Sequence, residues 1–195
     1  FDEGVTAYGR VGEWFAAQHF NVQPDIIITA KGITSGYIPL GAVLTTDAVA
    51  AELEKDFGFP MGFTYNGHPT AAAVALKNLE IIEEEGLLEK AKKMGQYLHE
   101  GLRTLLDLPI VGEVRFVGMM HAVELVTDKE SRTPLPMLQP MLPDVIRREE
   151  GVIVRDCAHN LVLSPPLIMT EEEADRMVAA MRKVLERTTS DGVIH

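Results

Sequence analysis

The sequence predicts an α/β chain, in which part of a mainly parallel sheet is followed by a small α+β domain. Over residues 1–85, short apolar runs alternate with helical patterns, which favours parallel strands joined by crossover helices. Beyond Gly86 the runs are typical of paired strands and a final helix. We therefore expect two domains, at residues 1–85 and 86–195.

The strand expected at residues 26–30 is an apolar run, typical of a strand buried on both faces, and Lys31 follows it. Open α/β sheets bind ligands at the carboxyl ends of their strands. A lysine there either snorkels to water or is held for chemistry. Glycines at positions 32, 36 and 41 favour a chemical role for Lys31, because they let the backbone lie against a flat ligand.

The next cluster runs from Gly62 to Pro69 and predicts a turn that leads into a helix. The helix is expected at residues 71–85. His68 has no second histidine at metal-ligand spacing, so we expect it to be structural and to bond to its own loop.

The second domain is expected to hold a small sheet flanked by helices. Thr170 and Glu173 form a capping box that opens the last helix. Before it, the patterns predict a helix at 87–106, paired strands at 111–117 and 119–126, a proline-containing connection at 127–143, a helix at 144–150 ended by Gly151, and short strands at 152–154 and 161–163.

Composition limits the function classes. The 195 residues are 46% apolar and 24% charged, as in a soluble globular protein, and no apolar run approaches the roughly 20 residues of a spanning helix. A net charge of −11 argues against nucleic-acid partners. Cys157 is the only cysteine, which excludes an internal disulfide and a multi-thiolate zinc site. We expect a cytoplasmic protein without a metal or a membrane contact, and the opening at Phe1 suggests a fragment.

A family resemblance lies in the run Lys31-Gly-Ile-Thr-Ser-Gly-Tyr-Ile-Pro-Leu-Gly41. It resembles the lysine segment of class III pyridoxal-phosphate aminotransferases and is most similar to the branch that uses ω-amino acids or amines with pyruvate. The resemblance continues along nearly the whole chain, through an aspartate loop, the lysine segment, a threonine turn and an arginine strand. It implies the second half of a fold-type I large domain, a small C-terminal domain, and a homodimer with shared active sites.

The resemblance implies roles for four residues. Lys31 would hold pyridoxal 5′-phosphate (PLP) as a Schiff base and move a proton during the reaction. Asp2, in the run Asp2-Glu-Gly-Val-Thr-Ala-Tyr-Gly-Arg-Val-Gly12, would keep the pyridine nitrogen protonated. Thr64 would bind the cofactor phosphate of the neighbouring subunit. Arg155 would bind a substrate carboxylate through its planar fork.

Other readings of these residues stay open. Gly4 departs from the family pattern, which generally has a branched apolar residue there. Asp2 fits a solvated turn as well. Arg155 could form a surface pair with Asp156 or Glu150, and Arg115 is a second candidate for the carboxylate. We expect Arg155 on a polar loop, where its side chain can swing away from uncharged substrates.

The predicted function is transfer of an amino group from an ω-amino acid or amine to a keto acid such as pyruvate. Alternatives are another class III PLP enzyme, either a decarboxylase or an aminomutase, and an inactive fragment that keeps only the fold. A dehydrogenase is disfavoured, because no Gly-x-Gly-x-x-Gly follows a strand.

Overall fold

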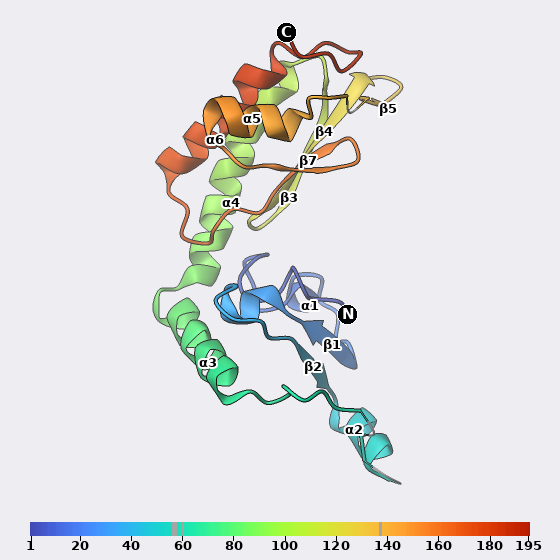
Figure 1. The fold of residues 1–195 in the computed structure, drawn as a ribbon, viewed down its shortest axis with the longest axis vertical. Coiled ribbons are helices and arrows are strands. Elements are labelled where there is room, and N and C mark those ends of the chain that lie inside the picture. Colours follow the sequence, from blue (N-terminus) through green and yellow to red (C-terminus); the bar gives the residue numbers. More distant parts are fainter. Residues whose placement is uncertain (56–57, 60, 137) are drawn as a thin grey trace. The chain divides into compact units, whose positions relative to one another are not determined.

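The computed structural model describes residues 1–55, 58–59, 61–136 and 138–195 of the chain. The chain divides into two compact units, Phe1–Glu89 and Lys90–His195, which we describe separately (Figure 1). The helix at residues 87–103 contains the point of division.

The first unit is built around two strands. Strand β1 (Ile26–Thr29) pairs antiparallel with β2 (Ala42–Thr45), so that Ile26 lies opposite Thr45. Asp2 forms a parallel bridge to Ile28 on β1. The helical elements are α1 (Ala16–His19), the 3-10 turn η1 (Lys31–Thr34), α2 (Asp47–Glu54) and α3 (Pro69–Glu84).

Two expectations for β1 need correction. Its isoleucines are not buried on both faces, since Ile26 is 42% exposed and Ile28 is 48% exposed. Ile26 and Ile28 point to one face of the strand, whereas Ile27 and the buried Thr29 point to the other, so one face of β1 lacks cover. The connection from β1 to β2 contains only η1 instead of a crossover helix, and the second strand therefore returns antiparallel.

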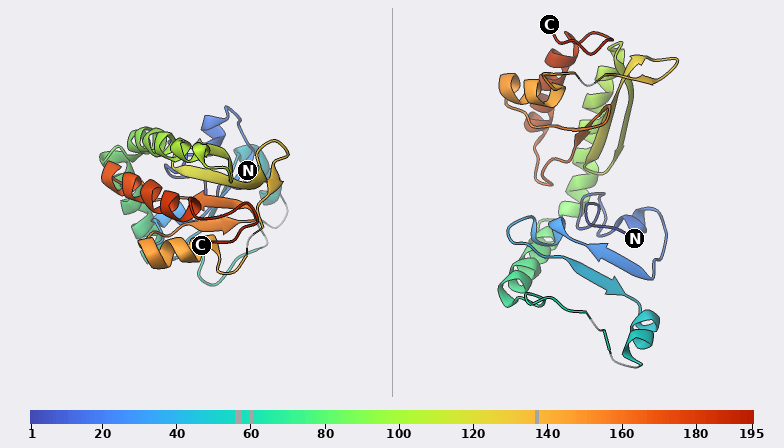
Figure 2. Two further views of the ribbon diagram at one scale, coloured as in Figure 1. Left: turned by 90° about the horizontal axis from the view of Figure 1, so that it is seen from above. Right: turned by 45° about the vertical axis from the view of Figure 1, so that its right-hand side comes forward.

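The second unit is an antiparallel sheet with helices on one face. Its strands lie in the order β3-β4-β7-β6, and β5 pairs with the final residues of β4. The strand bounds are β3 Val111–Val117, β4 Met120–Asp128, β5 Thr133–Pro134, β6 Arg155–Cys157 and β7 Asn160–Leu163. The helical bounds are α4 Leu87–Arg103, the 3-10 turn η2 Thr104–Asp107, α5 Leu142–Glu150 and α6 Glu171–Leu185 (Figure 2).

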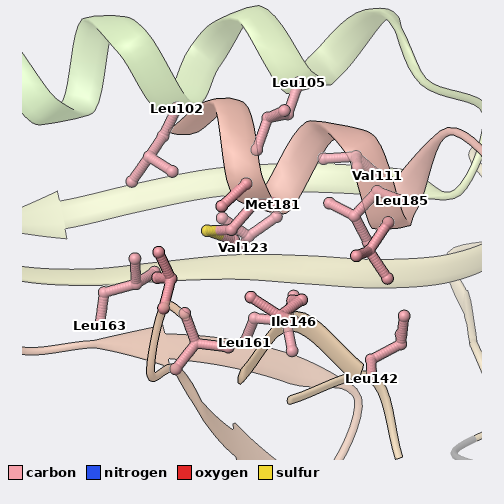
Figure 3. Close-up of a cluster of buried hydrophobic side chains, with 14 of the residues drawn as sticks. Leu102, Leu105, Val111, Val123, Leu142, Ile146, Leu161, Leu163, Met181 and Leu185 are labelled. Atoms are coloured by element: carbon pink, nitrogen blue, oxygen red, sulfur yellow. The ribbon is translucent and has the colours of Figure 1, made fainter. Parts of the chain in front are cut away.

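The core of this unit lies between the sheet and its three helices (Figure 3). Leu102 projects from α4, Leu105 from η2, and Met181 and Leu185 from α6. These four side chains are at most 1% exposed and contact Val123 and its neighbours on the strands. Burial of this apolar surface is the main stabilising contribution to the unit.

Helix α4 approaches the β3–β4 turn backbone to backbone at Gly95. A Cβ atom placed on Gly95 would lie 2.1 Å from the carbonyl oxygen of Gly118, which is closer than two such atoms can come. Gly118 itself has a φ of +53°, in the left-handed region that favours glycine. The carbonyl of Gly95 is also 3.0 Å from Nε2 of His121, so three positions join the helix to the hairpin.

Several boundaries in the second unit are as predicted, and others are not. The capping box of α6 is confirmed, with Thr170 and Glu173 bonded reciprocally, and Gly151 ends α5 at a φ of +70°. The strand expected at 152–154 is wrong, because the pairing with β7 begins at Arg155. The connection at 127–143 contains the short strand β5, which pairs with β4.

Among the described residues, no helix combines the length and the apolar character needed to cross a bilayer.

Candidate active site

The loop that precedes α1 is anchored by Glu3, a buried carboxylate that the sequence analysis missed. Glu3 is 1% exposed, and it accepts bonds of 2.8 Å from the backbone N–H groups of Ala16 and Ala17 and of 2.5 Å from the Thr6 hydroxyl. Its own N–H donates to Ile28 at 2.8 Å. The sequence contains a signal for this anchor, because α1 has Phe15 at its N-cap and its first N–H groups need an outside acceptor.

Asp2 and Lys31 meet at the backbone of Gly4. The N–H of Gly4 donates to Oδ1 of Asp2 at 2.9 Å, and Nζ of Lys31 donates to the carbonyl of Gly4 at 3.2 Å. A Cβ atom on Gly4 would lie 3.0 Å from Oδ1 of Asp2 and 3.5 Å from Nζ of Lys31. The carboxylate and the amine therefore converge on the same space, which a side chain at Gly4 would crowd.

The turn that carries Lys31 packs tightly against the glycine-rich loop. A Cβ atom on Gly32 would lie 3.2 Å from the carbonyl oxygen of Ala7 and 3.3 Å from Cβ of Tyr8. The buried Tyr8 hydroxyl also donates to Oγ1 of Thr29, at the end of β1, over 3.0 Å. The glycine at position 32 thus permits the close contact between the two predicted cofactor-binding segments.

A cleft of about 1100 Å³ opens beside Lys31. Its lining includes Thr29, Ala30 and Lys31 at the end of β1, and Phe63 and Tyr65 from the loop before α3. Thr64 lies between these two aromatic residues and is exposed, but it does not line the cleft. The structure thus brings Asp2 and Lys31 together and leaves Thr64 outside their immediate contacts.

His68 serves as the N-cap of α3, as expected for a structural histidine. Its Nδ1 atom accepts from the N–H of Ala71 at 3.4 Å, and Pro69 fills the first helical position. In the part of the chain that the structure describes, no group of three or more His, Cys, Asp or Glu residues could hold a metal ion.

In the second unit, the two candidate arginines lie in one row across the open face of the sheet. Arg115 on β3 pairs with Ala122, Ala122 with Val162, and Val162 with Arg155 on β6. Residues paired in this way point to the same face. The two guanidinium groups therefore occupy opposite edges of the same face.

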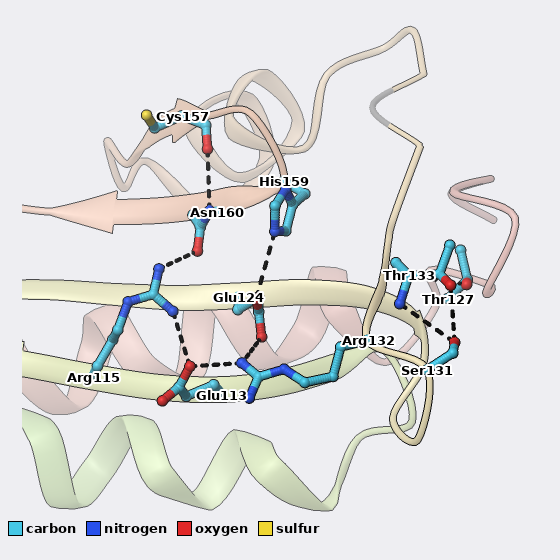
Figure 4. A network of polar contacts seen from close by, with 10 residues as sticks. All are labelled: Glu113, Arg115, Glu124, Thr127, Ser131, Arg132, Thr133, Cys157, His159 and Asn160. Atoms are coloured by element: carbon cyan, nitrogen blue, oxygen red, sulfur yellow. Dashed lines mark hydrogen bonds and ion pairs between the residues drawn. The ribbon is translucent and has the colours of Figure 1, made fainter.

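Arg115 is hydrogen-bonded to neighbouring side chains (Figure 4). It donates to Oε2 of Glu113 at 3.1 Å and to Oδ1 of Asn160 at 2.7 Å. Arg132 bridges Glu113 and Glu124, and its hydrogen bond holds the pKa of the Glu113 carboxyl below its usual range. This network gives Arg115 a structural role on the face.

Arg155, by contrast, is not held by neighbouring charged side chains among the described residues. It is exposed, and it takes part in no ion pair among the described residues. Glu150, one of its expected alternative partners, pairs instead with Lys183 at 2.7 Å. The expected loop position is wrong, because Arg155 begins the edge strand β6. Any displacement of its guanidinium therefore comes from side-chain rotation, since the backbone is paired with β7.

The first unit is α/β, with Lys31 shortly after β1 and Asp2 on the segment that pairs with β1, and a small antiparallel unit follows. Residues 1–185 match the family model of class-III aminotransferases, and the chain belongs to that family. Its solved neighbours are fold-type I transaminases, which confirms the predicted fold class.

Individual relatives agree with this assignment. The chain is 40% identical over 194 residues to a putrescine–pyruvate aminotransferase of Pseudomonas aeruginosa, covering 97% of this chain and 42% of that protein. An (S)-enantioselective omega-transaminase from Thermomicrobium roseum matches with a TM-score of 0.88 and 46% identity over 92% of this chain and 41% of its own. A PLP-bound amine transaminase from an uncultivated Pseudomonas species matches with a TM-score of 0.86 and 44% identity, over 92% of this chain and 42% of that one. The chain thus spans about two fifths of the length of these relatives.

Proposed function

We propose that the protein containing this chain is a PLP-dependent aminotransferase that moves an amino group from an ω-amino acid or amine to a keto acid such as pyruvate. The observation that carries the proposal is the convergence of Asp2 and Lys31 on Gly4 in a class-III chain. Similarity to a putrescine–pyruvate aminotransferase favours amino transfer over decarboxylation or an aminomutase reaction. The proposal includes a cytoplasmic location.

The residues fit the cofactor in their chemistry. PLP needs an amine for its aldehyde carbon and an anion for its ring nitrogen, and Lys31 and Asp2 supply one of each. When bound, PLP supplies an electron-withdrawing ring that stabilises negative charge on the donor carbon.

Each side chain then has a defined task. Asp2 would accept a hydrogen bond from the ring nitrogen and favour its protonated form. Lys31 would hold the cofactor through Nζ and would carry a proton at that nitrogen. Arg155 binds the carboxylate of the acceptor.

The covalent role of Lys31 is tested by borohydride reduction of the full-length protein with PLP, followed by peptide mapping. The pyridoxyl group should appear on Lys31, which lies at the end of β1 and against Gly4. Lys77 and Lys90 serve as internal controls, and finding the label on either of them would refute the assignment.

We further propose a homodimer in which Thr64 and the N–H groups at the start of α3 bind the cofactor phosphate of the partner. The position of Thr64 supports this, since it is exposed and lies outside the lining of its own cleft. Hydroxyl and backbone N–H donors at a helix start suit a phosphate.

A subunit-mixing experiment tests the shared site. We expect mixed Lys31→Ala and Thr64→Ala proteins to regain activity above either parent, since heterodimers place both lesions in one site and leave the other intact. The measurement is transamination rate after subunit exchange, and self-mixed parents are the controls. Exchange without recovery would place Thr64 in its own subunit's site or in none.

Loss of Arg155 should affect one half-reaction only. If the bound substrate desolvates the pair, we expect Arg155→Ala to raise the activation free energy for pyruvate by about 2–5 kcal/mol, and to leave a simple amine donor nearly unchanged, because only pyruvate has a carboxylate to pair. The measurement is kcat/KM in separate half-reactions. Arg115→Ala is the matched control from the same row of the sheet, and it should change both substrates equally. Equal losses for both substrates in Arg155→Ala would contradict the assignment.

A further inference from the structure

We propose that Asn78 on α3 is a positioning residue for Lys31, acting through the 3-10 turn that follows the lysine. This inference rests on the proposed function, since it concerns the lysine that would hold the cofactor. The sequence analysis gave Asn78 no role, because it is one polar position in a helix expected at residues 71–85.

The Asn78 amide is bonded to three residues of the same turn. Its Nδ2 atom donates to the carbonyl oxygens of Gly32 at 2.9 Å and of Ile33 at 3.2 Å. Its Oδ1 atom accepts from the hydroxyl of Ser35 at 2.7 Å. Two carbonyl acceptors on one side and a hydroxyl donor on the other fit an amide in a single orientation. The side chain is therefore a three-point clamp across the turn from a separate helix.

The turn needs such a clamp because its backbone is strained. Lys31 has a φ of +45°, and Ser35 has a φ of +48°, in the left-handed region that side chains disfavour. Strained residues of this kind persist only where surrounding contacts determine their conformation. Within the turn, the Ser35 N–H donates to Gly32 at 3.2 Å and the Gly36 N–H to Lys31 at 3.3 Å. Asn78 adds contacts from a separate helix to this local bonding.

Asn78 also contacts other atoms of the turn than the glycine-rich loop does. That loop contacts Gly32 through Ala7 and Tyr8, whereas Asn78 bonds to the carbonyls of Gly32 and Ile33. Held between them, the turn fixes the Cα of Lys31 and hence the reach of Nζ to the Gly4 carbonyl, next to Asp2. A shift of about 1 Å at a reacting group can cost roughly 100-fold in rate.

Three variants of the full-length protein separate this role from general stability. Asn78→Ala removes all three bonds, and Asn78→Asp keeps the shape but faces two carbonyl oxygens with a carboxylate. Ser35→Ala is the matched control, since it removes only the bond to Oδ1. We expect the loss of half-reaction rate and the rise in amide hydrogen exchange to be larger in Asn78→Asp than in Asn78→Ala. Both variants should show much larger effects than Ser35→Ala.

The first readout is the amine half-reaction. In the PLP-loaded protein, Asn78→Ala should lower the maximal rate roughly 10- to 100-fold and leave the half-saturating amine concentration within about 2-fold. A purely structural role would not lower the maximal rate while leaving amine binding intact.

The second readout needs no cofactor. Amide hydrogen exchange in the PLP-free protein should rise at least about 10-fold within residues 33–37 in both Asn78 variants, and change little in Ser35→Ala. An unchanged exchange rate in Asn78→Ala would overturn the inference. So would a faster-exchanging turn with wild-type kinetics. If the wild-type protein itself forms no cofactor band and takes no borohydride label, the proposed function fails, and with it the link from Asn78 to a cofactor-holding lysine.

Discussion

Replacing Lys31 with alanine is expected to lower the transamination rate by more than about 10⁴-fold in the full-length protein. The substitution removes the proposed covalent anchor of the cofactor and the group proposed to carry the proton, and a positioned acid–base group alone contributes about 10²–10⁴-fold. It also removes the bond from Nζ to Gly4. The measurement is single-turnover conversion of bound PLP with an amine donor.

Chemical rescue distinguishes the proton-carrying role from a loss of structure. Added methylamine should restore part of the rate in Lys31→Ala, because a free amine can accept the proton from the vacated space. Lys77→Ala on α3 is the control, since the exposed Lys77 forms ion pairs with Glu80 and Glu84 on its own helix. A Lys31→Ala protein with ordinary turnover would remove Lys31 from the mechanism.

Replacing Asp2 with asparagine should slow proton transfer by about 100-fold or more while PLP still binds. Asparagine keeps the oxygen that accepts from the N–H of Gly4, so the loop retains its local geometry. It lacks the negative charge that favours a protonated ring nitrogen. The expected result is a slow half-reaction with near-normal cofactor affinity, measured by stopped-flow absorbance and by titration with PLP.

Asp25→Asn is the matched control for Asp2→Asn. Asp25 is an exposed aspartate in the turn before β1, and its replacement changes the net charge by the same amount. It should leave the half-reaction unchanged. Near-normal turnover in Asp2→Asn would instead show that the carboxylate only stabilises its turn.

The features that sequence predicted well are those set by nearby residues. The capping box at Thr170 and the left-handed Gly151 depend on a few neighbouring positions, and both are confirmed. The place of Lys31 at the end of a strand follows from an apolar run and the glycines after it, and the structure has the same arrangement. Local steric and hydrogen-bonding rules determine all of these.

Features that depend on distant partners were not predictable in the same way. Whether β2 returns parallel or antiparallel is decided by how the chain between the strands folds, which periodicity does not encode. The start of β6 at Arg155 is set by its pairing with Val162 on β7. Glu3 and Asn78 each bond to segments far along the chain, so an ordinary glutamate and asparagine became anchors only in three dimensions.

The contact between Gly95 and Gly118 restricts how this protein can change by mutation. The atom that a side chain at Gly95 would strike belongs to the main chain, so no substitution in the surrounding core could make room for it. Helix α4 and the β3–β4 turn would have to separate together, which would also break the link from Gly95 to His121. Any redesign of the small domain, whether to widen a substrate pocket or to raise thermal stability, should therefore hold these two glycines fixed and vary the apolar positions around them.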